Sequence, residues 1–258
     1  MTVSSAATLP VEKIGEAATG PLWFQLYTAA DLDSTRERVE RAMAAGCKTI
    51  CYTVDSQYGP NRERLLRDRS TRAPSASAPR QRQQQPGGRG TAFELPEQYR
   101  LRPSLSAKLT WSFLDQLNAW AKAPVLVKGI LTPEDARLCV ERGAAGVIVS
   151  NHGARRLDRT PSTIEVLPEI VDAVGGKIPV LIDGGFRRGT DILKALAIGA
   201  KAVMVGRPPV WGLGAYGQAG AQRVLELLQT ELARDMALAG CSSLASISRS
   251  LVRIEPSR

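Results

Sequence analysis

Short apolar runs alternate with longer amphipathic stretches along most of this chain, and that alternation restricts its fold more than any other feature. Each run is four to six residues long, ends at polar residues or glycine, and precedes a stretch with apolar residues at helical spacing. Strands that alternate with helices of this size indicate βαβ units and a parallel sheet. The expected strands are residues 22–27, 49–54, 125–128, 146–150, 180–183 and 202–205. The expected helices are residues 31–45, 132–142, 164–174 and 188–198.

A further strand is expected at residues 1–4, which gives seven in all, whereas a closed (β/α)8 barrel has eight. The sequence therefore predicts an α/β fold of the TIM (β/α)8-barrel type that lacks its first strand. A length of 258 residues suits one such domain, so residues 1–258 are expected to form a single domain. A doubly wound open sheet is the alternative, but no glycine-rich dinucleotide fingerprint follows an early strand.

One helix carries clear signals at both of its ends. Thr132 is a suitable N-cap, Pro133 fits the first turn, and Asp135 follows the cap by three residues. Gly143 is a typical residue to close the same helix. These signals support the helical interpretation of the stretches between the strands.

Much of the net charge of +9 comes from one segment. Between residues 62 and 102, arginines outnumber acidic residues by more than two to one, and clusters of serine, glutamine and glycine make the segment low-complexity. This composition is typical of mobile chain, so we expect a mobile arginine-rich loop at residues 69–107. Its aromatic residues are too few to form a stacking platform for bases, and we expect no nucleic-acid partner.

Targeting, membrane and metal signals are weak throughout the sequence. No apolar run is long enough to span a membrane, and residues 1–8 lack the basic start and apolar block of a secretory signal. We expect no membrane partner and a cytoplasmic location, with a peroxisomal one left open by residues 256–258 (PSR). The four cysteines do not form a metal-site pattern, so buried inert thiols and no metal are expected.

Polar side chains follow nearly every expected strand, at the end that faces the active site in a barrel of this type. Ordinary turn residues account for glycine, asparagine, aspartate and serine there, but not for Lys128 or for the only histidine, His152. A neutral imidazole accepts a proton near neutral pH, and the guanidinium of Arg155 can hold a carboxylate. This pairing suits proton removal from a substrate that carries a carboxylate. The strand-end residues are Gln25, Tyr27, Thr53, Asp55, Lys128, Ser150, Asn151, His152, Asp183, Gly184, Gly185, Gly206 and Arg207.

The last two strand ends have the features of an anion site, here called the phosphate cradle: residues 183–187 (DGGFR) and 205–208 (VGRP). Their glycines let backbone N–H groups approach an anion closely, and Arg187 and Arg207 add positive charge. Barrels often bind a phosphate after strands seven and eight. The sequence therefore predicts a ligand that carries a phosphate.

At these residues the chain closely resembles the FMN-dependent 2-hydroxy-acid dehydrogenases, which include glycolate, lactate and mandelate oxidases. The resemblance runs from about residue 3 to residue 253 and is interrupted only by the arginine-rich loop. It implies FMN as cofactor and oxidation of a small (S)-2-hydroxy acid to the 2-oxo acid, with oxygen or another acceptor reoxidising the flavin. A homo-oligomer, tetrameric by family analogy, is also implied. Its most specific stretches are residues 23–27 (WFQLY), 150–158 (SNHGARRLD), 179–190 (PVLIDGGFRRGT) and 206–208 (GRP).

The resemblance also implies a role for each residue of the site. His152 would be the base, Asp183 would orient it and stabilise its protonated form, and Lys128 would stabilise negative charge on the reduced flavin. Tyr27 would hydrogen-bond the substrate, and Arg62 and Arg155 would clamp its carboxylate. The arginine-rich loop would be the active-site lid. The flavin would be bound by Ser4, Gln25, Thr53, Lys128, Ser150, Asp183, Gly185, Arg187, Gly206 and Arg207.

The sequence departs from the family pattern at three places. The family's N-terminal helices and first barrel strand are absent from this sequence, which predicts weakened activity unless a partner supplies the strand. Phe186 stands where the family usually has valine. Ala6 stands where glycolate-type enzymes tend to have a large aromatic residue, which predicts a roomier pocket for aromatic or longer hydroxy acids.

Two other functions stay open on the sequence alone. A catalytically impaired chain that binds FMN or assembles with other subunits would agree with the missing strand. A phosphate-binding barrel isomerase or lyase would explain the phosphate cradle, but it gives Lys128 and the pair of His152 and Arg155 no shared purpose.

Overall fold

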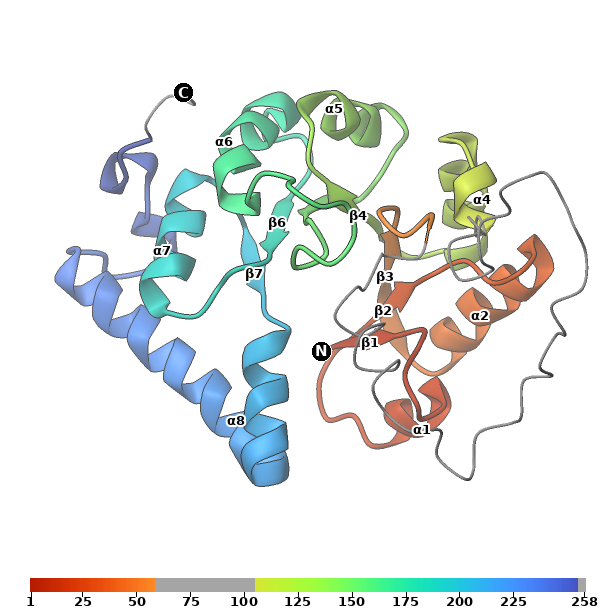
Figure 1. Ribbon diagram of the computed structural model, residues 1–258, viewed down its shortest axis with the longest axis horizontal. Coiled ribbons are helices and arrows are strands. Elements are labelled where there is room, and N and C mark those ends of the chain that lie inside the picture. The colour runs from red at the N-terminus through yellow and green to blue at the C-terminus, as the bar shows by residue number, and fades with distance from the viewer. Residues whose placement is uncertain (59–104, 255–258) are drawn as a thin grey trace, which may run out of the picture.

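The computed structural model describes residues 1–58 and 105–254, which form a curved sheet of seven strands covered by helices (Figure 1). The strands follow one another in chain order across the sheet, and every neighbouring pair is parallel. This architecture confirms the predicted partial barrel of the (β/α)8 type. The strands are β1 (Thr2–Ser4), β2 (Leu22–Leu26), β3 (Cys47–Thr53), β4 (Val125–Ile130), β5 (Gly146–Val149), β6 (Val180–Asp183) and β7 (Ala202–Met204).

The helices lie between successive strands, as the alternating pattern predicts. The four expected helices are confirmed to within two residues at each end, whereas α1, α4 and α8 were not specified by the sequence pattern. Three short 3-10 turns, η2 (Leu105–Lys108), η3 (Leu244–Ser246) and η4 (Arg249–Leu251), complete the described chain. The helices are α1 (Val11–Glu16), α2 (Leu32–Ala44), α4 (Ser112–Ala121), α5 (Pro133–Glu141), α6 (Thr163–Val174), α7 (Gly189–Ile198) and α8 (Arg207–Leu238).

The predicted signals at the ends of α5 are confirmed in detail. The side chain of Thr132 accepts a hydrogen bond from the backbone N–H of Asp135, and Pro133 occupies the first turn. Gly143 follows the helix with a φ of +70°, a backbone conformation that favours glycine. Local sequence chemistry therefore fixes both ends of this helix.

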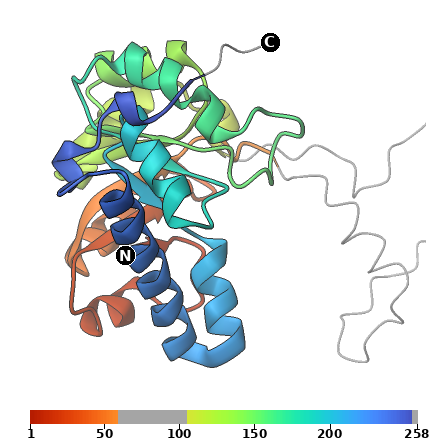
Figure 2. The same ribbon diagram turned by 90° about the vertical axis from the view of Figure 1, so that its left-hand side faces the viewer.

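The helix α8 consists of two arms that turn back at Tyr216 and Gly217, whose backbone angles are not helical. Figure 2 shows the two arms (blue) side by side, extending away from the sheet. Gly212 and Gly220 are buried where the arms meet, and a Cβ atom on Gly212 would collide with the carbonyl of Gly220. Glycine at both positions therefore permits the close packing of the arms.

Two layers of apolar side chains hold the barrel together. The inner layer fills the space inside the curved sheet and includes Cys51, Leu126, Ile148 and Leu181. The outer layer packs the strands against the helices, and all four residues of β5 are buried. Strands of a parallel sheet that is covered on both faces are expected to be apolar along their whole length. This explains why the strands appear in the sequence as continuous apolar runs.

The sheet has two edges within the described residues. There β1 pairs only with β2, and β7 pairs only with β6. Because all seven strands run in the same direction, their carboxyl ends meet on one side of the sheet, where the predicted site residues gather. No helix in residues 1–58 and 105–254 has the length and apolar character needed to cross a membrane.

Candidate active site

His152 is held between two side chains that come from other strands. Its Nδ1 lies 2.8 Å from Oδ1 of Asp55, and its Nε2 lies 3.1 Å from the hydroxyl of Tyr27. The Tyr27 and His152 rings are nearly parallel, with 6.2 Å between their centroids. Tyr27 follows β2, Asp55 follows β3 and His152 follows β5, so the parallel sheet brings these three residues, here called the catalytic cluster, to one place.

The backbone at His152 is also constrained. Its φ is +56°, in the left-handed region that residues other than glycine seldom adopt, and its N–H donates to Oγ of Ser150 over 3.1 Å. Unusual backbone angles of this kind cluster at active sites, where the surrounding contacts hold them in place. The imidazole is therefore fixed both by its own backbone and by Asp55 and Tyr27.

The structure corrects the predicted partner of His152. The sequence assigns Asp183 to orient the imidazole, but Asp55 occupies that position, and Asp183 instead pairs with Lys128 over 2.9 Å. Asp55 follows a buried strand and is named among the strand-end residues, yet no role was assigned to it. Its only sequence signal is its place directly after an apolar strand, which does not reveal which neighbour it faces.

Lys128 lies in a second polar group beside the catalytic cluster. Its Nζ donates to Oγ of Ser150 over 2.7 Å and pairs with Oδ2 of Asp183. The Lys128 side chain is only 12% exposed and Ser150 is fully buried, so the ammonium group is held by few, well-defined partners. A positive charge is thereby presented to the pocket, as expected for a group that stabilises a negative one.

A row of hydrogen bonds connects the ends of the first three strands. The hydroxyl of Ser4 donates to Oε1 of Gln25 over 2.9 Å, and Nε2 of Gln25 donates to Oγ1 of Thr53 over 2.8 Å. Ser4 and Gln25 are direct partners in the register of β1 and β2. Three of the residues predicted to bind the flavin are thus brought together.

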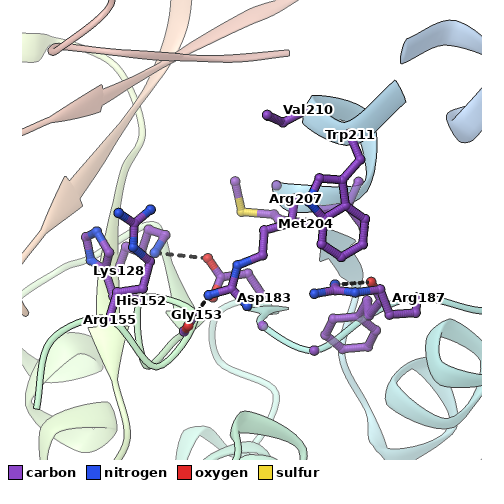
Figure 3. A pocket seen from close by; sticks show the side chains of 15 residues that line it. Lys128, His152, Gly153, Arg155, Asp183, Arg187, Met204, Arg207, Val210 and Trp211 are labelled. Atoms are coloured by element: carbon purple, nitrogen blue, oxygen red, sulfur yellow. Dashed lines mark hydrogen bonds and ion pairs between the residues drawn. The ribbon is translucent and has the colours of Figure 1, made fainter. Parts of the chain in front are cut away.

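The phosphate cradle forms the other side of the same pocket, a cavity of about 380 Å³. Figure 3 shows Lys128, His152 and Arg155 on one side, Arg187 and Trp211 on the other, and Asp183 and Arg207 between them. The volume of the pocket falls within the range of small-molecule sites. The predicted residues Gly185 and Gly206 also line it.

The arginines of the cradle contact backbone carbonyl groups. Nη1 of Arg187 donates to the carbonyl of Phe186 over 2.7 Å, and Nη2 of Arg207 donates to the carbonyl of Gly153. Gly185 has a φ of +88°, which favours glycine and gives the turn after β6 its shape. Phe186, where the family usually has valine, is buried in the outer apolar layer.

The chemistry of these residues fits FMN. Among the described residues, two buried side-chain oxygens lack a hydrogen-bond partner: Oδ1 of Asp183 and Oδ2 of Asp55. A buried acceptor without a donor costs about 1–3 kcal/mol, so a ligand with hydroxyl donors is favoured beside Asp183. Arg187 and Arg207 offer guanidinium groups suited to a phosphate. A polyol that ends in a phosphate, such as the ribityl phosphate of FMN, meets both requirements.

Not all predicted residues can be placed. Arg155 lines the pocket near His152 (Figure 3), but Arg62 lies outside the described residues. Residues 69–104 of the expected lid also lie outside them, and residues 105–107 belong to η2. Trp211, which lines the pocket beside the cradle, was not singled out in the sequence.

The cysteines are buried and free, as predicted. Burial raises the pKa of the Cys51 thiol to about 12 and that of the Cys139 thiol to about 12. Thiols with such pKa values are almost entirely protonated near neutral pH and react slowly. In the part of the chain that the structure describes, no cluster of three or more potential metal ligands occurs.

Comparison with known proteins agrees with this geometry. The model of the FMN-dependent dehydrogenase family matches residues 1–254. The 2-hydroxyacid oxidase 1 of Mus musculus is 43% identical over an alignment of 268 residues, and the alignment covers 99% of this chain and 70% of that protein. The glycolate oxidase of Spinacia oleracea is 43% identical over 250 residues, covering 97% of this chain and 68% of that protein.

A solved structure shows the same arrangement of elements. The crystal structure of mandelate oxidase with (S)-2-phenylpropionate has a TM-score of 0.78 and 40% identity, covering 96% of this chain and 67% of that one. The fold and the site thus define a flavin-dependent oxidoreductase built on an α/β barrel. The chain belongs to the FMN-dependent dehydrogenase family, and its cofactor is FMN.

Proposed function

We propose that the chain oxidises an (S)-2-hydroxy acid to the 2-oxo acid, with His152 as the base. The observation that carries this proposal is the catalytic cluster, in which one nitrogen of the His152 imidazole contacts a carboxylate and the other contacts a phenol, while His152 itself lines the pocket. The names of the similar proteins, which include hydroxyacid, glycolate and mandelate oxidases, support the same substrate class.

The contact with Asp55 determines which nitrogen of His152 can accept a proton. A carboxylate accepts hydrogen bonds, so Nδ1 is the nitrogen that carries the hydrogen in the neutral imidazole. Nε2 then presents its lone pair to Tyr27, and the phenol donates to it. Asp55 also stabilises the imidazolium that forms when Nε2 takes up a proton, as a carboxylate does in hydrolytic triads.

The reaction removes two protons and two electrons from the hydroxyl-bearing carbon and its oxygen. His152 takes one proton at Nε2, whether the second leaves with the electrons as hydride or separately. FMN, when bound, would supply the acceptor for the two electrons, which oxygen or another oxidant would then take up. Tyr27 is placed to hydrogen-bond the substrate hydroxyl or carboxylate next to His152.

Two positive charges on the His152 side of the pocket support the orientation of the substrate and the flavin. Arg155 lines the pocket beside His152 and provides a guanidinium for the substrate carboxylate, a function that Arg62 would share. Lys128, held by Ser150 and Asp183, places a positive charge where the reduced flavin would accumulate a negative one. These residues bind and orient, whereas proton transfer stays with His152.

Anaerobic mixing of the FMN-loaded chain with hydroxy acids tests this function. We expect loss of the visible flavin absorption with (S)-2-hydroxy acids, little loss with the (R) enantiomers, and recovery when air is admitted. A chain that binds FMN and keeps its absorption with every hydroxy acid tried would contradict the proposal.

A second function is favoured by one observation. Within the described residues, β1 and β7 each have a single neighbour, so the barrel does not close. A chain with this sheet could bind FMN and turn over poorly. Cofactor binding without reduction in the anaerobic experiment would support that second function.

A further inference from the structure

Trp211 contacts the phosphate cradle from the first arm of α8. The Cζ atom of Arg187 lies 4.8 Å from the centre of the Trp211 ring. Arg207 and Trp211 are four residues apart on the same helix, so their side chains lie on one face of it. Figure 3 shows the indole beside Arg187 and Arg207, on the side of the pocket away from His152 and Lys128.

Trp211 is not a residue of the apolar core. The residue is 56% exposed, although an indole is among the largest apolar side chains. Instead, the ring of Trp211 lies against the guanidinium of Arg187. An arginine guanidinium over the face of a tryptophan is attracted by the negative face of the ring, and tryptophan provides the strongest such interaction.

Two contacts restrict the Arg187 side chain: the indole of Trp211 and the turn after β6, to which Arg187 itself belongs. Nη1 of Arg187 donates to the carbonyl of Phe186, which uses part of the guanidinium edge, and Trp211 covers its face. The rest of the edge still offers donors, because a guanidinium has five N–H groups in a fixed plane. A plane that is held in position loses less rotamer entropy when it binds a phosphate.

We propose that Trp211 is a positioning residue that holds Arg187 for the phosphate of FMN, and so contributes to affinity through the phosphate alone. This inference rests on the FMN site described above. Because Trp211 lies away from Lys128 and His152, it contributes nothing to binding of the isoalloxazine ring. FMN and riboflavin, which differ only in the phosphate, therefore separate the two contributions.

The proposal is tested by titrating the apoprotein with FMN and with riboflavin, with quenching of flavin fluorescence as the measured signal. Trp211→Leu is expected to raise the Kd for FMN by about two- to fivefold, the size of an exposed cation–π contact, and to leave the Kd for riboflavin unchanged. Trp211→Phe keeps an aromatic face and is expected to recover most of the FMN affinity. Leu213→Ala, an exposed apolar side chain on the same helix, is the matched control and is expected to change neither Kd.

A double-mutant cycle with Arg187→Ala identifies the residue through which Trp211 acts. In that background Trp211→Leu is expected to have no further effect on the Kd for FMN. An equal effect in both backgrounds, or an equal loss for FMN and riboflavin, would overturn the proposal and assign Trp211 a general structural role. A parent chain that binds neither flavin would overturn the FMN site itself, which is a different outcome.

Discussion

The two sides of the pocket are held together in different ways. In the catalytic cluster, Tyr27, Asp55 and His152 follow three different strands, and Tyr27 and Asp55 each contact the imidazole of His152. In the phosphate cradle, Arg187 contacts the carbonyl of the residue before it, and glycines shape the turn. The cluster is therefore a product of strand register, whereas much of the cradle is encoded in a few consecutive residues.

This difference gives the two sides different chemical tasks. Side chains from separate strands of a rigid sheet can be held in the geometry that proton transfer requires. The cradle presents guanidinium groups and backbone N–H groups, which bind an anion without reacting with it. Changes in the cluster should therefore affect turnover, and changes in the cradle should affect FMN affinity.

The largest expected effect is the loss of His152. We expect His152→Gln to lower kcat/KM by about 10³-fold, within the usual range of a general base, while the Kd for FMN changes little. Stopped-flow reduction under anaerobic conditions and flavin titration measure the two quantities. A large rise in the Kd for FMN would mean that the two sides of the pocket are not separate.

The next largest effect concerns Asp55. Asp55→Asn removes the negative charge that stabilises the protonated imidazole and no longer requires the hydrogen to be on Nδ1, so kcat should fall by about 10²-fold. Asp183→Asn is the comparison variant, because Asp183 belongs to the cradle and pairs with Lys128, whereas the partner of His152 is Asp55. The main expected effect of Asp183→Asn is a loss of FMN affinity. Equal losses of kcat with unchanged FMN affinity in both variants would contradict this assignment.

The same contrast explains what the sequence could predict. The strands and four of the helices depend on local patterns such as the apolar runs, and these predictions are confirmed. The phosphate cradle also depends on a local pattern, the glycine turn at Gly184 and Gly185, and most of its residues line one pocket. The partner of His152 depends on which strand ends face each other, and Asp55 is 97 residues away in the chain. Two carboxylates at strand ends look alike in sequence, so Asp183 was assigned in place of Asp55.

Trp211 shows the same limit on the side of the cradle. Its spacing from Arg207 can be read from the sequence, but its contact with Arg187 depends on the packing of α8 beside the turn after β6. An exposed tryptophan in a helix has no local signal that separates a surface residue from one that holds a neighbouring arginine.

A third prediction concerns the cradle directly. We expect Arg187→Ala to raise the Kd for FMN by about 10-fold or more, since a hydrogen bond to a charged group contributes about 1.5–3 kcal/mol. The kcat measured at saturating FMN should stay close to that of the parent chain. Isothermal titration and steady-state kinetics with added FMN provide the measurements, and a collapse of kcat at saturating FMN would mean that Arg187 also supports the catalytic cluster.

The last prediction concerns Ala6, the position where the family resemblance implies contact with the substrate tail. This exposed residue is the second after β1, and its backbone N–H donates to Oγ of Ser4, a residue of the hydrogen-bonded row at the flavin site. Ala6→Trp adds a large side chain there and should lower kcat/KM for mandelate relative to glycolate by about tenfold, within the range of discrimination by pocket size. FMN affinity should not change, because Ala6 is not a residue of the cradle. If the parent chain has a higher kcat/KM for glycolate than for mandelate, the prediction is contradicted. The small residue at position 6 would then not determine the substrate preference.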